Sequence, residues 1–224
     1  MNEALNSIRL SGRIFSSPVY DHTIFGEAFY KLEVSASRLS GTEDILPVTI
    51  SERLLVGLEN GIAEVGNGIE ISGQIRSYNQ RTETGSRLII TVFAREVYFF
   101  GSDEMDDFRY FNETELIGHI CKPVTYRTTP FSREIADILI AVNRRYGKSD
   151  YLPCIAWGRN ARFASELTIG DYVLVRGRMQ SRIYQKDLGN GVIEDRIAYE
   201  ISCSSIEKKG FATAGEQCEI KPLL

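Results

Sequence analysis

One short segment, VRGRMQSRIY at 175–184, carries residues at alternate positions that could bind a ligand. Every second position carries an arginine, an amide or a ring: Arg176, Arg178, Gln180, Arg182 and Tyr184. Successive side chains of a β-strand point to opposite faces, so a strand here would place three guanidinium groups and a ring on one side. Guanidinium groups bind phosphate, and both they and a ring stack on flat groups. The question is which elements hold this face and what it contacts.

The composition indicates a globular protein. The chain has 224 residues, of which 43% are hydrophobic and 25% are charged, so it is not expected to be disordered. The longest nearly apolar run, near 138–142, is far shorter than the ~20 residues that cross a bilayer. The first ten residues show no signal-peptide pattern. We therefore expect no membrane association.

Neither the cysteines nor the histidines form a pattern that binds metal. The chain has four widely separated cysteines, Cys121, Cys154, Cys203 and Cys218, which are expected to be reduced thiols. His22 and His119 are its only histidines, so we expect no metal and no cofactor. We find no nucleophile–base pair, no phosphate loop and no carboxylate pair in an evident cleft, and therefore expect that the protein is not an enzyme.

Charge is distributed unevenly along the chain. The net charge is −6 over 1–111, +3 over 112–209 and −1 over 210–224, which together give the −4 of the whole chain. The basic middle part is therefore the better candidate for contact with a polyanion.

The chain also repeats itself in four blocks that occur in the same order. The pairs are 6–14 with 112–120, 45–50 with 151–156, 65–77 with 169–181, and 87–97 with 196–206. The offsets are 106, 106, 104 and 109 residues, and the small shifts between them are expected to fall in loops. We therefore predict a tandem duplication with a first module at 1–100, an acidic linker at 101–111, a second module at 112–209 and a mobile tail at 210–224.

The second module reads as five strands and one helix. The expected strands are 115–120, 134–145, 151–158, 171–184 and 196–207, which are rich in Val, Ile, Tyr and Leu. A short helix is expected within 159–170, with Asn160 as its possible N-cap and Gly170 as its end. A helix between the third and fourth of five strands predicts an oligonucleotide/oligosaccharide-binding (OB) fold, a partly open Greek-key barrel. Gly118 and Gly177 are expected at sharp bends of its strands. We thus predict an all-β protein of two tandem OB barrels with one short helix in each.

The second module resembles the bacterial single-stranded DNA-binding (SSB) proteins. The resemblance lies in NETELIGHI at 112–120, in Arg127 near the first hairpin, in AWGRNARFA at 156–164 and in the spacing from Gly170 to Tyr184. It covers 112–207 well and 6–98 more weakly, through the repeat. It implies sequence-tolerant binding of single-stranded DNA by base stacking and phosphate contacts, in replication, recombination and repair in the bacterial cytosol or a phage-infected cell.

The resemblance also implies the site. The family's stacking aromatics fall on Tyr146, Tyr151, Trp157 and Tyr184, and Phe131 in a hairpin either stacks or caps the barrel. Phosphate or base contacts are expected from the basic residues of the same strands and turns: Arg127, Arg144, Arg145, Lys148, Arg159, Arg176, Arg178, Arg182 and Lys186. We expect three neighbouring strands to bring these side chains onto one platform.

The first module departs from this pattern, because Ile45, Ser51 and Gln80 stand opposite Tyr151, Trp157 and Tyr184. Three interpretations are open: the first module mediates dimerisation, it guides the single-stranded DNA weakly, or it stabilises the second module. We favour assembly, since a homodimer would supply the four OB modules that the resemblance implies. Alternative functions are a primosomal or recombination accessory factor that acts mainly as a protein scaffold, and a purely protein-binding tandem OB module. The acidic C-terminal tail by which family members recruit replication and repair enzymes is not matched here.

Overall fold

The computed structural model describes residues 5–55, 63–82, 85–101, 109–144, 147–187 and 191–210. The predicted tail from 211 onward and most of the predicted linker lie outside these ranges. Within them the chain is mainly β-strand, as the alternation of apolar and polar residues predicts. No helix in the described ranges is both long and apolar enough to cross a membrane.

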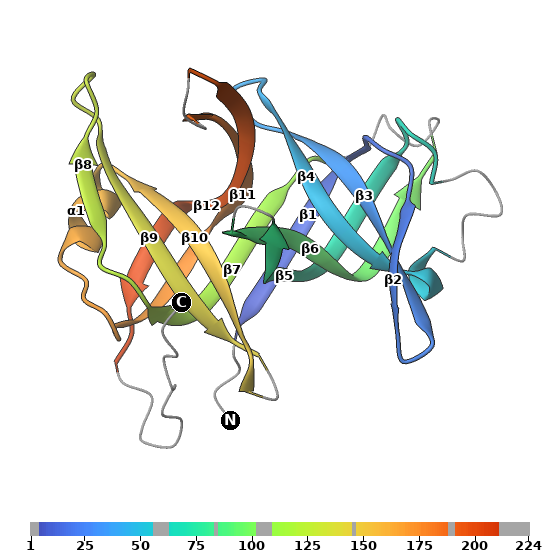
Figure 1. The fold of residues 1–224 in the computed structure, drawn as a ribbon, viewed down its shortest axis with the longest axis horizontal. Helices are drawn as coiled ribbons and strands as arrows, with labels where there is room; N and C mark the ends of the chain where they lie inside the picture. Colours follow the sequence, from blue (N-terminus) through green and yellow to red (C-terminus); the bar gives the residue numbers. More distant parts are fainter. Residues whose placement is uncertain are drawn as a thin grey trace. The chain divides into compact units, whose positions relative to one another are not determined.

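The first module is a barrel built from β1 to β6 (Figure 1). Its strands are β1 Asn6–Ile14, β2 Val19–Ile24, β3 Glu27–Ser37, β4 Glu43–Ser51, β5 Gly68–Thr82 and β6 Gly85–Phe100. The strand order is β2-β3-β4-β6-β5-β1, and the additional pairing of β1 with β3 closes the sheet on itself. A short 3₁₀ helix, η1 at Glu52–Leu54, follows β4 at the position where the second module has its α-helix.

The second module repeats this arrangement with β7 to β12 and a helix (Figure 1). Its elements are β7 Asn112–Ile120, β8 Thr125–Thr128, β9 Glu134–Asn143, β10 Ser149–Trp157, α1 Arg159–Ser165, β11 Tyr172–Asp187 and β12 Ile193–Lys208. The strand order is β7-β11-β12-β10-β9-β8, closed by the pairing of β7 with β9. The helix lies between β10 and β11, which are the third and fourth of the five predicted strands, and β8 is an additional short strand that was not predicted. This position of the helix confirms the predicted OB fold. The predicted N-cap was wrong: Gly158 caps α1, while the Asn160 amide donates to the Ser204 carbonyl at 2.9 Å.

Glycine allows the closest backbone approach in each barrel. A Cβ atom on Gly118 would lie 2.4 Å from the carbonyl oxygen of Ala141, and one on Gly12 would lie 2.2 Å from that of Ser35. Both distances are shorter than any real Cβ contact, so only glycine lets these strands close. The residues of the two pairs are each separated by the same 106 residues as the sequence blocks. The duplication is therefore visible at the level of backbone contacts.

The compact units of the structure do not follow the chain in a simple order. One unit is built on Glu115–Gly177, and the other combines Ser7–Thr114 with Arg178–Ile201. The outer part of the β11–β12 hairpin thus packs with the first module. The predicted module boundaries remain a proposal. The sequence repeat assigns this hairpin to the second module, whereas the compact units assign it to the first.

Candidate nucleic-acid interface

A row of three residues crosses β8, β9 and β10. Arg127 of β8 pairs with Ile135 of β9, and Ile135 pairs with Trp157 of β10. Directly opposite residues of paired strands lie on the same face, and neighbouring strands are about 4.8 Å apart. Arg127 and Trp157 therefore lie on one face, roughly 10 Å apart between their backbones. Trp157 is 40% exposed, although tryptophan is usually well buried.

The alternation of β10 explains why Trp157 is exposed. Leu152, Cys154 and Ala156 point into the core and are buried, so the residues between them point outward. Tyr151 begins this outward row and is half-buried opposite Ala141, whereas Ile155, within the same row, is buried. The structure thus brings Tyr151 and Trp157 to one face, with apolar residues between them. We call this surface, with Arg127, the β8–β10 face.

Phe131 lies at the end of the β8–β9 hairpin and is 86% exposed. The turn is fixed by the backbone N–H of Thr129, which donates to the Arg133 carbonyl oxygen, and by that of Ser132, which donates to the Thr129 carbonyl oxygen. Ser132 adopts a positive φ of 57°. A fully exposed ring on a well-defined turn is available to stack on a ligand, and it does not cap the core.

The guanidinium of Arg127 forms a surface ion pair. Its Nη2 lies 3.1 Å from the Asp137 carboxylate, and about half of each side chain is exposed. Exposed pairs contribute little, about 0–1 kcal/mol, because water and salt screen them. A phosphate can therefore replace Asp137 at low energetic cost.

Arg144 is paired with a buried carboxylate, and Arg176 is paired with two partly exposed ones. The Nε of Arg144 donates to the fully buried carboxylate of Asp150 at 2.7 Å, an ion pair that recurs in the first module between Arg38 and Asp44. Because both barrels contain it, this pair belongs to the structure of the barrel. Arg176 lies between two carboxylates, with its Nη1 2.9 Å from Glu207 and its Nε bonded to Glu115. The hydrogen bond to Glu115 is the main cause that raises the pKa of Arg176.

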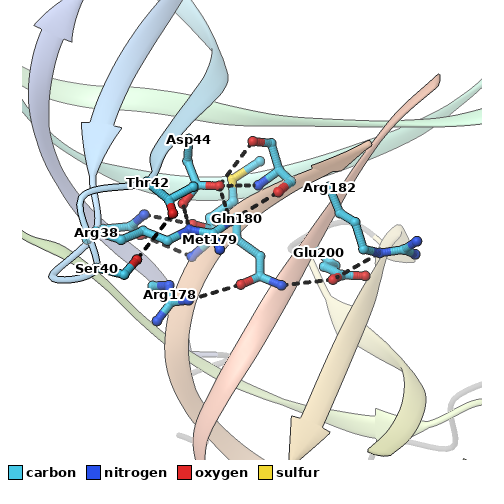
Figure 2. Close-up of polar contacts among 11 residues, drawn as sticks. Arg38, Ser40, Thr42, Asp44, Arg178, Met179, Gln180, Arg182 and Glu200 are labelled. Carbon is cyan, nitrogen blue, oxygen red and sulfur yellow. Dashed lines mark hydrogen bonds and ion pairs between the residues drawn. The ribbon is translucent and has the colours of Figure 1, made fainter. Parts of the chain in front are cut away.

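The outer part of β11 carries a second group of predicted residues, of which Arg178 and Arg182 are labelled in Figure 2. Arg178 is half-buried and donates to Gln180 at 3.1 Å, and its Nε atom is buried without a hydrogen-bond partner among the described residues. The Arg182 side chain is 51% exposed, and its guanidinium carbon lies 5.8 Å from the ring centre of Tyr184. We call Arg182 and Tyr184 the hairpin pair.

The expectation of three neighbouring strands was wrong. β9 and β10 pair along their whole lengths, but β12 lies between β10 and β11 in the sheet. In a closed Greek-key barrel the fifth strand is inserted between the third and the fourth, which the order along the chain conceals. The predicted residues therefore form two groups, the β8–β10 face and the hairpin pair.

The remaining predicted residues are divided between exposed positions and undescribed ones. Lys148, Arg159 and Lys186 have exposed side chains. Tyr146 and Arg145 lie outside the described residues, so their roles stay predictions.

The comparison of repeats missed an aromatic cluster in the first module. His22 stacks on Phe29 at 5.2 Å, Phe29 lies 5.7 Å from Phe93, and the Arg95 guanidinium lies 5.3 Å from the Phe93 ring centre. A groove of about 350 Å³ in the same compact unit is lined by residues that include Lys31, Glu33, Pro47, Tyr78, Ile89 and Tyr199. These rings do not stand at the aligned positions, and the strand pattern of β3 and β6 was the only signal for them.

The thiols and acidic groups of the described residues were compared with the needs of a metal ion. Cys154 and Cys203 are buried, and the thiol of Cys121 donates to the Leu139 carbonyl oxygen at 3.3 Å. In the part of the chain that the structure describes, no three His, Cys, Asp or Glu side chains gather as ligands of an ion.

Comparison with known proteins places this geometry in a family. Residues 111–208 match the single-strand binding protein family. A single-stranded DNA-binding protein 1 of Streptococcus pyogenes is 30% identical over 105 residues, which are 44% of this chain and 80% of the relative. The chain belongs to the single-strand binding protein family. The matched region contains all of β8, β9 and β10, so the β8–β10 face lies within the part that defines this membership.

Other members of the family match shorter or longer parts. Single-stranded DNA-binding protein 1 of Staphylococcus aureus is 31% identical over 103 residues, or 43% of this chain, and the chain spans only 59% of the length of that relative. The single-stranded DNA-binding protein of Thermus aquaticus is 26% identical over 219 residues, covering 88% of this chain and 83% of the relative. Its crystal structure matches with a TM-score of 0.69 at 24% identity, over 94% of this chain and 97% of that one. This likeness supports the fold of two tandem barrels.

Proposed function

We propose that the protein binds single-stranded DNA without sequence preference and protects it during replication, recombination and repair. The observation that carries this proposal is the row in which Arg127 and the exposed Trp157 share one face of the second barrel. The family and the names of its relatives point to the same ligand.

The chemistry of the row suits a flexible polyanion with flat bases. An aromatic ring stacks on any base, with about 1–3 kcal/mol per base, and needs no sequence match. A guanidinium in a weak surface pair exchanges its carboxylate for a phosphate. The net charge of +3 over 112–209 attracts the strand to this module.

Additional contacts extend this site in the proposal. The hairpin pair offers a cation and a ring from β11, and Phe131 offers a ring at the end of the β8–β9 hairpin. Tyr146, Arg145, Lys148, Arg159 and Lys186 belong to the proposed path of the strand as predicted residues. The proposal describes a binding protein of the bacterial cytosol and assigns no catalytic residue.

The test uses the single tryptophan of the chain, which stands in the proposed site. We expect poly-dT to quench the fluorescence of Trp157 and the apparent affinity to fall steeply between about 50 and 200 mM salt, because bound phosphates release counterions. Poly-rU in a parallel titration measures the preference for DNA over RNA. Unchanged fluorescence at the lower salt, with no shift of a labelled oligonucleotide in a sizing column, would refute the proposal.

We also propose that the chain forms a homodimer, which would bring four OB barrels together. Each chain contributes two barrels, whereas the Streptococcus pyogenes relative is matched over little more than one module. Sedimentation velocity across a range of protein concentrations tests this, and a monomer at every concentration would contradict it.

A further inference from the structure

A buried carboxylate of the first module holds the outer part of β11. Asp44 is 0% exposed, and one of its oxygens accepts hydrogen bonds from the backbone N–H of Ser181 at 2.7 Å and from the Ser181 hydroxyl at 3.0 Å. Arg38 donates to the same carboxylate through Nε at 2.7 Å and Nη2 at 2.6 Å. The Nη2 of Arg38 also donates to the Ser181 carbonyl oxygen at 3.1 Å.

The charge of Asp44 makes this contact strong. Burial by itself raises the pKa of the carboxyl, but the hydrogen bonds from Arg38 and from Ser181 outweigh it and lower the pKa below its ordinary value. The carboxylate is therefore ionised at neutral pH, and two of its four donors come from Ser181. A buried ionised carboxylate that loses donors is destabilised strongly, so Asp44 favours the arrangement in which β11 is bound.

A continuous set of contacts leads from Ser181 to the hairpin pair. Arg182 follows Ser181 directly, and its Nε lies 3.5 Å from the carboxylate of Glu200. Glu200 is 7% exposed and also accepts from Gln180 at 2.9 Å (Figure 2). The guanidinium of Arg182 in turn lies over the ring of Tyr184. The backbone of Arg182 is thus fixed through Ser181, and its side chain is fixed through Glu200.

We propose that Asp44 is a positioning residue for nucleic-acid binding. With Arg38, it fixes β11 at Ser181 and so holds Arg182 and Tyr184 where they meet the single strand. The first module thereby supports binding by the hairpin without contacting the DNA through these two residues. This inference rests on the proposed function, because it assumes that the hairpin pair contacts single-stranded DNA.

The test compares the full chain with Asp44→Asn, which keeps the size of the side chain and removes its charge. We expect hydrogen exchange at the amides of 178–187 to become faster by about tenfold or more, because asparagine offers one neutral acceptor oxygen in place of two charged ones. We expect the Kd for a labelled oligo-dT to rise by roughly tenfold. Glu70→Gln is the matched control, because it breaks the ion pair of Glu70 with Arg9 in the same module. The control should leave both measurements at the wild-type values.

A double-mutant cycle separates positioning from binding. In a chain that carries Arg182→Ala and Tyr184→Ala, Asp44→Asn should accelerate exchange but should weaken DNA binding no further. Wild-type exchange and wild-type affinity for Asp44→Asn would overturn the inference, as would faster exchange with an unchanged Kd. If Arg182→Ala with Tyr184→Ala leaves the Kd unchanged while Trp157 remains quenched, the role of the hairpin pair is wrong and the function of the β8–β10 face stands.

A second variant covers the case in which Asp44→Asn does not fold. Ser181→Ala leaves the pair of Arg38 and Asp44 intact and removes only the hydroxyl donor. We expect it to accelerate exchange over 178–187 by a smaller factor, about threefold to tenfold. Exchange at the wild-type rate would overturn the inference.

Discussion

Replacement of Trp157 by alanine tests the assignment of the β8–β10 face most directly. Trp157 is 40% exposed, at the end of β10, so its ring is available to a base. Loss of one stacked base costs about 1–3 kcal/mol, which corresponds to a Kd about 5- to 150-fold higher. Trp157→Phe keeps a ring and should retain most of the affinity.

Arg127→Ala tests the phosphate contact of the same face. Removing one phosphate contact should lower the slope of log Kobs against log[salt] by about 1. The backbones of Arg127 and Trp157 are roughly 10 Å apart in the row, and Ile135 lies between them. The free-energy changes of the two substitutions should therefore add to within about 0.5 kcal/mol.

The assay is the fluorescence anisotropy of a labelled oligo-dT, because Trp157→Ala removes the intrinsic signal. Far-ultraviolet circular dichroism and thermal unfolding show whether each variant is folded, since the buried part of the Trp157 ring also packs on the barrel. A folded Trp157→Ala variant that binds with the wild-type Kd and the wild-type salt slope would refute the assignment of this face.

Two further predictions concern the barrel that carries the site. Gly118→Ala should lower the free energy of unfolding by about 1–3 kcal/mol in denaturant titrations, because the new Cβ would lie 2.4 Å from the Ala141 carbonyl oxygen. Gly210→Ala is the control: a Cβ there has nothing within 4 Å, so the free energy of unfolding should change by less than about 0.5 kcal/mol. The ring of His119 lies 4.8 Å from that of Tyr172, and burial lowers the pKa of His119. Near the ordinary histidine pKa of about 6.5, the unfolded chain therefore binds more protons than the folded chain. Stability should therefore fall as pH drops from about 7.5 toward the lowered pKa, and a His119→Gln variant that shows the same fall would contradict this reasoning.

Much of the fold could be read from the sequence because its signals are local. Alternation of apolar residues predicted a strand at 134–145, and β9 is Glu134–Asn143. The helix after β10 was predicted from its spacing, and it identified the OB fold, but its predicted end was wrong: α1 ends at Ser165 with Glu166 as its C-cap, before Gly170. The repeat offsets located Gly12 and Gly118, which the structure places in equivalent close contacts. Period, turn residues and duplication all act within short stretches of chain.

The site was less predictable because its partners come from distant parts of the chain. Gln180 lies on the predicted polar face of β11 but is buried, and Glu200 of the neighbouring strand accepts its hydrogen bond. Arg176 is bonded to Glu115, 61 residues away. The contact of Arg38 with Ser181 spans 143 residues. No local pattern specifies which of many acidic or polar residues such side chains meet, so their faces were predictable and their partners were not.

The contact of Asp44 with Ser181 has a consequence for synthesis on the ribosome. Ser7–Thr114 emerges first, but the compact unit to which it belongs also requires Arg178–Ile201. At about 5–20 residues per second, translation of the intervening segment takes on the order of several seconds. During this interval the nascent first barrel exists with a carboxylate that lacks half of its final donors. A fragment cut at the linker lacks Ser181 altogether, so its Asp44 would keep only the donors from Arg38.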